Sequence, residues 1–183
     1  MNAFAAALSQ HPVPTEAVGE LAGALLEGLD GERADLLVLF LSPHFAGATE
    51  DVAGALRRLL EPVVMIGGAV AAVIGGTREI EDAPGISAWA ARLPTSEVTP
   101  VALHGDAIPE AGDAHTLLLL ADPFSCPVDA LLESLHAAHA GLQVIGGLAS
   151  AAHGPGGNRL VLDGRVHTSG AVGALLAGDA ADD

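Results

Sequence analysis

The stretch Ile66-Gly67-Gly68-Ala69-Val70-Ala71 recurs 79 residues later as Ile145-Gly146-Gly147-Leu148-Ala149-Ser150. In both copies we expect an apolar strand to run into a turn formed by the paired glycines, which adopt backbone angles that other residues avoid. A second Gly-Gly pair and an arginine follow each copy at nearly the same spacing. We therefore interpret the chain as two similar halves, at about residues 15–104 and 114–178, that arose by internal duplication.

Each half has the sequence pattern of a strand, a helix and a second strand. In the first half the apolar run 36–41 predicts a buried strand. Thr49 is a candidate N-cap for a helix that ends at Pro62, and a short β-branched strand follows at 63–66. The second half repeats this order, with a strand at 117–121, a helix that begins at Pro127 and ends near Gly141, and a strand at 142–145.

Other segments add a helix, a hairpin and a last strand to this plan. Apolar spacing predicts a helix over 15–29 with Thr15 as its N-cap. The pair Asp163-Gly164 favours a type I′ turn between strands at 159–162 and 165–168. A closing strand is expected at 171–177, and 103–113 has the composition of an exposed connector. The predicted fold is α/β with mixed sheets and helices, in which two sheets from the two halves pack together.

Composition excludes several classes of protein. The chain has 183 residues, of which 50% are hydrophobic and 16% are charged, so it is not a disordered chain. A net charge of −16 disfavours binding to nucleic acid and to anionic membranes. Cys126 is the only cysteine, which excludes an internal disulfide. No basic segment precedes the first alanines, so we expect a cytoplasmic protein without a secretion signal.

Several motifs in a fixed order resemble one known family. They are Gly67-Gly68 with 71–79, then 121–125, 144–150, 157–159 and 170–173. Together they resemble the amino-terminal FIST sensory domain, named after F-box and intracellular signal transduction proteins. The resemblance covers most of the chain, and we take residues 1–183 as one domain of the amino-terminal type. It implies a cytoplasmic ligand-sensing module that is attached to or acts with signalling proteins. Family members normally continue into a carboxy-terminal FIST domain, which is absent here, so we expect either a fragment or a stand-alone half.

A polar pocket near the glycines is the predicted ligand site. Bare N–H groups beside paired glycines suit a carboxylate, and arginine suits bidentate carboxylate recognition. Small metabolites such as amino acids are the ligands that the resemblance implies, so an amino acid or a similar small anion is expected. Structural ion pairing is the alternative role for the arginines. The predicted ligand-binding residues are Gly67, Gly68, Arg78, Gly146, Gly147, Ser150, Asn158 and Arg159.

Three other functions remain open from the sequence. The resemblance implies haem-based nitric-oxide sensing for some members. A haem would need an axial ligand such as a histidine, for which the candidates are His44, His104, His115, His153 and His167. An enzyme using Cys126 as nucleophile would need a base that the sequence does not identify, so we expect a non-enzymatic protein. His136 and His139 have helical spacing for a shared metal but lack further ligands, so no metal site is expected. Finally, the chain could be an assembly module that pairs with a carboxy-terminal FIST domain.

Overall fold

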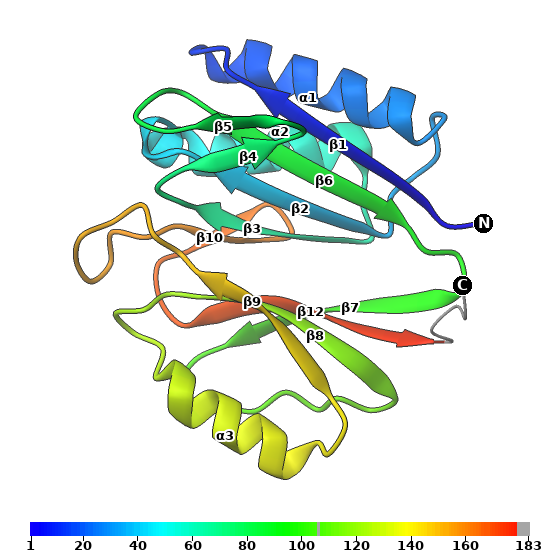
Figure 1. Ribbon diagram of the computed structural model, residues 1–183, viewed down its shortest axis with the longest axis vertical. Helices are drawn as coiled ribbons and strands as arrows, with labels where there is room; N and C mark the ends of the chain where they lie inside the picture. The colour runs from blue at the N-terminus through cyan, green and yellow to red at the C-terminus, as the bar shows by residue number, and fades with distance from the viewer. Residues whose placement is uncertain (106, 179–183) are drawn as a thin grey trace.

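A computed structural model describes residues 1–105 and 107–178 as four layers. Two helices cover the outer face of one sheet, that sheet packs on a second sheet, and a third helix covers the second sheet from the far side (Figure 1). The helices are α1 (Pro14–Gly28), α2 (Thr49–Leu60) and α3 (Val128–Ala138), and a short 3₁₀ helix η1 (Pro43–Ala48) precedes α2. None of the described helices is long and apolar enough to cross a bilayer.

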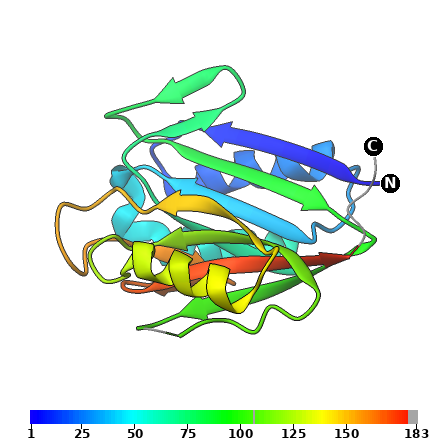
Figure 2. The same cartoon turned by 60° about the horizontal axis from the view of Figure 1, so that its bottom comes forward.

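Ten strands form the two packed sheets. The first sheet has the order β1 (Ala3–Ser9), β6 (Ile86–Arg92), β2 (Leu36–Leu41), β3 (Val64–Ala69), β10 (Leu160–Leu162) and β11 (Arg165–His167). The second sheet has the order β7 (Ser96–Leu103), β12 (Ala171–Gly178), β8 (Ala114–Ala121) and β9 (Gln143–Leu148). A separate hairpin of β4 (Val73–Gly75) and β5 (Arg78–Ile80) contacts β1 and β6, apart from the second sheet (Figure 2).

The two sheets share one strand order when they are followed along the chain. In the first, β2 and β3 are parallel and joined by α2, and in the second β8 and β9 are parallel and joined by α3. The order β1-β6-β2-β3 thus matches β7-β12-β8-β9. The hairpins differ, because β4–β5 stands alone whereas β10–β11 extends the first sheet at the edge of β3. The fold is α/β with mixed sheets, and internal duplication is a plausible origin of the matching order.

Aliphatic side chains fill the spaces between the layers. Leu37 and Leu39 of β2 point toward the helices, where they join Leu21 of α1 and Leu56 of α2. The alternate residues of the same strands point toward the second sheet, as expected for a strand buried on both faces. The side chains between the sheets include Val38, Val64, Ile66, Leu120, Leu160 and Val172.

The paired glycines lie inside strands, so the turn predicted from them is wrong. Gly67-Gly68 belongs to β3 and Gly146-Gly147 to β9. A Cβ on Gly67 would overlap the carbonyl oxygen of Leu39, and a Cβ on Gly146 would overlap that of Leu119. The glycine in each copy therefore permits close approach to the neighbouring parallel strand, and the strand continues beyond it.

Both predicted N-caps lie one or two positions inside their helices. Pro14 occupies the first turn of α1 and Val13 is its cap, so Thr15 is helical. The N-cap of α2 is Ala48, and the Thr49 hydroxyl instead donates to the carbonyls of Phe45 and Ala46 at 3.2 Å. The hairpin prediction is confirmed, because Asp163 and Gly164 have φ of 49° and 80° between β10 and β11.

Candidate functional site

The two glycine-containing segments meet at their carboxy-terminal ends. The Ser150 hydroxyl accepts a hydrogen bond from the Ala71 amide at 3.0 Å. The Ser150 amide in turn donates to the carbonyl of Ala69 at 3.3 Å. The ends of β3 and β9 are therefore tied together, although they lie in different sheets.

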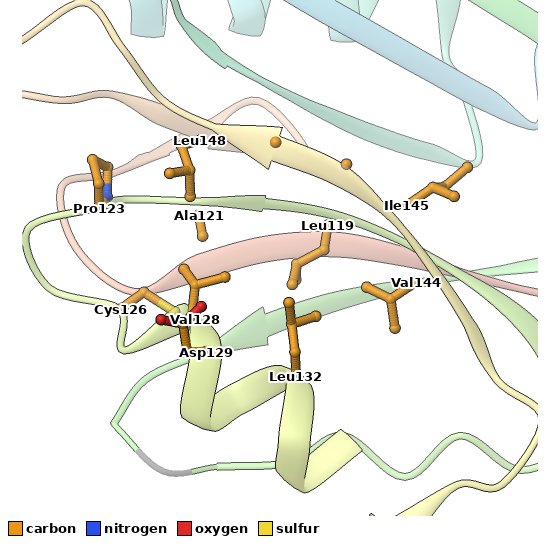
Figure 3. A pocket seen from close by; sticks show the side chains of 12 residues that line it. Leu119, Ala121, Pro123, Cys126, Val128, Asp129, Leu132, Val144, Ile145 and Leu148 are labelled. Atoms are coloured by element: carbon orange, nitrogen blue, oxygen red, sulfur yellow. The ribbon is translucent and has the colours of Figure 1, made fainter. Parts of the chain in front are cut away.

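A cavity of about 540 Å³ lies between α3 and the strands β8 and β9. Figure 3 shows Leu132 and Val128 of α3 pointing toward Leu119 of β8 and Val144 of β9. Asp129 and Cys126 lie at the end of the cavity where α3 begins. The full lining is Leu119, Ala121, Pro123, Cys126, Val128, Asp129, Leu132 and residues 144–148.

Strand β9 forms one wall of this cavity and of a second one. The second cavity, of about 260 Å³, lies between the two sheets and is lined by Val38, Phe40 and Gly68 on one side. Gly146, Gly147 and Leu148 line both cavities. Ile145 is 55% exposed and Leu148 is 49% exposed. These exposed fractions are high for aliphatic side chains in a strand that pairs with the largely buried strand β8. This strand therefore offers contacts to molecules on either side.

A buried polar network fixes the loop behind the cavity. Asp122 and Asn158 are fully buried, and the Asn158 side-chain amide donates to Asp122 Oδ1 at 2.8 Å and to the Ala149 carbonyl at 3.3 Å. The Ser125 hydroxyl donates to Asp122 Oδ2 and accepts from the Gly170 amide at 2.8 Å. All these polar side chains have partners within the protein, which is the usual state of a structural network.

The Cys126 thiol lies beside this network. Partial burial, and secondarily the nearby Asp122 carboxylate, raise the pKa of Cys126 above its ordinary value. Both effects disfavour the thiolate, which is the nucleophilic form. The environment of Cys126 is thus the reverse of one that activates a cysteine nucleophile.

The structure does not bring all of the predicted ligand-binding residues together. Gly68, Gly146 and Gly147 line cavities, and Ser150 lies at the contact between the two segments. Gly67 is buried against β2, and Asn158 is committed to the internal network.

The two arginines lie outside both cavities. The Arg159 guanidinium donates to the carbonyls of Gly156, Gly157 and Asn158 at 2.9–3.0 Å, so it closes its own loop. Arg78 is exposed on β5 and lines neither cavity. The two arginines have equivalent positions in the sequence, but their hairpins do not have equivalent positions in the structure. β4–β5 forms a separate two-stranded sheet, whereas β10–β11 pairs with β3.

The candidate histidines also lie away from the two larger cavities, whose linings contain no histidine. His104 and His167 are neighbours, with ring centroids 5.9 Å apart. His139 ends α3 and its Nε2 atom lies 2.9 Å from the Pro109 carbonyl oxygen. In the described part of the chain, no group of three potential metal ligands comes together.

Sequence reasoning missed the cavity residues of α3. The helical spacing predicts a buried stripe of Val128, Leu131, Leu132 and Leu135, but only Leu131 and Leu135 are buried. Leu132 is 40% exposed and lines the cavity together with Val128. Apolar periodicity cannot distinguish a residue that packs on a sheet from one that faces a cavity beside the sheet.

Comparison with known proteins identifies the family. The family model described as FIST N domain matches residues 35–182. The chain belongs to the FIST family. This membership confirms the resemblance seen in the sequence and places the protein among sensory domains of signal transduction.

Longer relatives occur in mycobacteria. The uncharacterized protein MT0656 of Mycobacterium tuberculosis (strain CDC 1551 / Oshkosh) is 32% identical over 183 residues, covering 93% of this chain and 47% of the relative. The uncharacterized protein Mb0898c of Mycobacterium bovis is 32% identical over 177 residues, covering 91% of this chain and 45% of the relative. The FIST chain therefore spans about half the length of these curated relatives.

Proposed function

We propose that this FIST domain senses a small ligand and that the cavity between α3 and β9 binds it. The observation that carries the proposal is the size and lining of that cavity, about 540 Å³ with mostly apolar walls and polar groups at one end. Small-molecule sites have this character, with an apolar surface and a few polar groups that orient the ligand. Its position on β9, where the ends of the two glycine segments meet, also supports a sensory role.

The ligand class that fits this lining is an amino acid with an apolar side chain. Leu119, Leu132 and Val144 offer an apolar wall for the side chain. Asp129 offers a carboxylate for the ammonium group, and no lysine or arginine lines either of the two larger cavities. A zwitterion suits this lining better than a simple anion. A simple anion would lie near the Asp129 carboxylate with no cationic side chain to pair with.

The start of α3 provides a place for the ligand carboxylate. The first hydrogen bond of this helix runs from the Leu131 amide to the Pro127 carbonyl at 2.9 Å. The preceding amides of the first turn, including those of Val128 and Asp129 in the cavity lining, have no partner within the helix. Such amides attract carboxylates.

Ligand binding would signal through β9. A ligand that packs against Val144 and Leu132 favours one position of α3 relative to β9, and β9 also borders the cavity between the sheets. A ligand shifts an equilibrium only through different contacts in the two states, and these contacts supply the difference. The cytoplasmic location and the downstream partner remain predictions from the sequence.

Two alternatives from the sequence gain less support. A haem would need an axial ligand at its cavity, and histidines do not line the two larger cavities. A cysteine-dependent enzyme would need an activated thiol, whereas burial raises the pKa of Cys126. We therefore retain the non-enzymatic sensor as the proposal.

The test is a thermal melt with leucine, methionine, valine and phenylalanine, and with acetate and hemin as comparison compounds. A ligand of the folded state raises the Tm in a concentration-dependent way. We expect at least one apolar amino acid to do so and acetate to have no effect. Leu132→Trp, which fills the cavity, and Asp129→Asn, which removes the carboxylate, should each reduce the shift.

Matched control variants lie on α2, the helix that corresponds to α3 in the first half. Leu59 is exposed on this helix and Asp51 lies in its first turn. Leu59→Trp and Asp51→Asn should leave the ligand-induced Tm shift unchanged. Absence of a shift with every amino acid, or equal shifts in the Leu132 and Leu59 variants, would contradict the proposed site.

A further inference from the structure

Strand β9 is an edge of the second sheet, and its outer backbone groups are directed away from the sheet. The Ala149 amide donates to the Ala121 carbonyl of β8 at 2.9 Å. Because backbone groups alternate in direction along a strand, Ile145 and Gly147 also face β8, whereas Val144, Gly146 and Leu148 face outward. No strand pairs with this outer edge in the described part of the chain.

The corresponding strand of the first half has a partner at the same edge. The amide of Ala69 in β3 donates to the Arg159 carbonyl at 2.8 Å, and the Met65 carbonyl accepts from Asp163 at 2.8 Å. Ala69 lies 79 positions before Leu148, and Met65 lies 79 positions before Val144. Both Leu148 and Val144 face outward from β9. The β10–β11 hairpin thus occupies on β3 the edge that is open on β9.

The hairpin on β3 also covers the inner face of the other sheet. The first strand of this hairpin, β10, contacts β12 and β7. These are the two strands of the second sheet that lie farthest from β9. At its other edge the second sheet ends with β9. Across the smaller cavity, β9 faces Val38 and Phe40 of β2.

Beyond β2, the β4–β5 hairpin covers the inner face of β6 and β1 at one end, where the Ser87 hydroxyl donates to the Ile74 carbonyl at 2.6 Å and Gly75 lies against Leu8 (Figure 2). The opposite end of this face, at Phe4, is exposed.

An aromatic pair lies toward this exposed end. Trp89 of β6 is opposite Val38, so it shares the inner face with it, and its ring stacks on Phe4 of β1 with centroids 5.8 Å apart. Trp89 is 38% exposed and Phe4 is 57% exposed. A strand added at the edge of β9 would lie over β6 and β1, as β10 lies over β12 and β7.

We propose that β9 is a docking edge for an antiparallel β-hairpin from the other half of a longer FIST protein, and that this hairpin covers Phe4 and Trp89. The bound hairpin pairs with the outward groups of Val144, Gly146 and Leu148 and presents apolar side chains to the aromatic pair. The relatives that extend to about twice the length of this chain supply such a second half. The docking edge concerns a protein partner and stands independently of the ligand cavity.

The probe for this proposal is the half of the M. tuberculosis relative MT0656 that this chain does not match, purified separately and checked for a cooperative melt. Trp89 is the only tryptophan of the chain, so it reports directly on the proposed contact. On titration with the probe, we expect saturable binding, a blue shift of the Trp89 emission and weaker quenching by acrylamide. The emission is corrected for tryptophans of the probe.

Two proline variants separate docking from a general loss of structure. Leu148→Pro removes an outward amide from β9 and leaves the hydrogen bonds to β8 in place, so binding should weaken at least tenfold. The control is Ala102→Pro on β7, the opposite edge of the same sheet, where Pro100 already lies in the same phase. This variant should bind like the unmodified chain.

Three results of the binding measurements would each overturn the proposal. These are no binding by the unmodified chain, equal binding by the Leu148 and Ala102 variants, and binding without a change in Trp89 emission. Self-association of the chain that is lost in Leu148→Pro would assign the edge to a second copy instead and would likewise overturn it. The amino-acid Tm shift of the isolated chain is measured separately, so failure of one proposal is distinguishable from failure of the other.

Discussion

At the scale of single residues, Gly146 and Gly147 are adjacent in β9 but differ in the space around them. A Cβ on Gly146 would overlap the backbone of Leu119, and the residue has φ of 152°. A Cβ on Gly147 would have no neighbour within 4 Å. The first glycine therefore sets the spacing of β8 and β9, whereas the second leaves open space beside the cavities.

This difference predicts unequal effects of alanine at the two positions. Gly146→Ala should lower the free energy of unfolding by about 1–3 kcal/mol, because the backbone of β8 or β9 must move. Gly147→Ala should change it by less than about 0.5 kcal/mol. Urea unfolding followed by circular dichroism measures both values. Equal destabilisation by the two variants would show that the close approach of β9 to Leu119 is not the reason for the glycine.

The residue scale also shows where sequence reasoning about the site fails. Pairs of glycines and arginines at equal spacing were visible in the sequence, and Gly68, Gly146 and Gly147 do line cavities. Arg159 was equally visible, but whether it faces a ligand or its own loop carbonyls depends on the path of the loop. The sequence carries no local signal for that choice.

At the scale of elements, the hairpin β10–β11 brings His167 close to other basic groups. Partial burial lowers the pKa of His167, and the positive charges of His104 and Arg165 lower it further. In the unfolded chain the histidine has its ordinary pKa, about 6.5, so the unfolded state binds the proton more readily. Stability from this group is therefore present above pH 6.5 and is lost as the pH falls toward the lowered pKa of the folded state.

The replacement His167→Gln should remove this contribution. The fall in Tm between pH 7 and pH 5 should be smaller in the variant, by no more than about 2 °C because the side chain is partly exposed to solvent. Differential scanning calorimetry at several pH values measures the effect. His153→Gln, in an exposed loop, is the control, and an equal change in both variants would exclude a specific role for His167.

The elements themselves were predicted where one local rule dominated. The buried run of β2, the helix α2 ended by Pro62, and the Asp163-Gly164 hairpin were all visible in the sequence. The strands β1, β6 and β7 were not assigned, because alanine-rich and mixed segments have weak strand preference and are fixed by pairing with distant strands. The expected glycine turn was wrong because glycine in a strand and in a turn look alike before the neighbouring strand is known.

At the scale of the whole molecule, the shared strand order of the two sheets accompanies unequal covering of their edges. The first sheet has two helices on its outer face and a hairpin at the edge of β3. The second sheet has α3 alone as its helix, and β9 is open at its edge. We infer that this difference leaves room both for the ligand cavity and for a partner hairpin at β9.

Residue-resolved hydrogen exchange by NMR is the most direct test that β9 is the open counterpart of β3. We expect the amides of Ile145, Gly147 and Ala149, which face β8, to exchange at least about a hundredfold more slowly than those of Val144, Gly146 and Leu148. In β3, amides on both sides of the strand should be slow, such as Ala69, which donates to the Arg159 carbonyl beside β10, and Val64, which donates to the Asp35 carbonyl beside β2. Uniformly slow exchange along β9 would contradict the open edge, and with it the account of how the two halves differ.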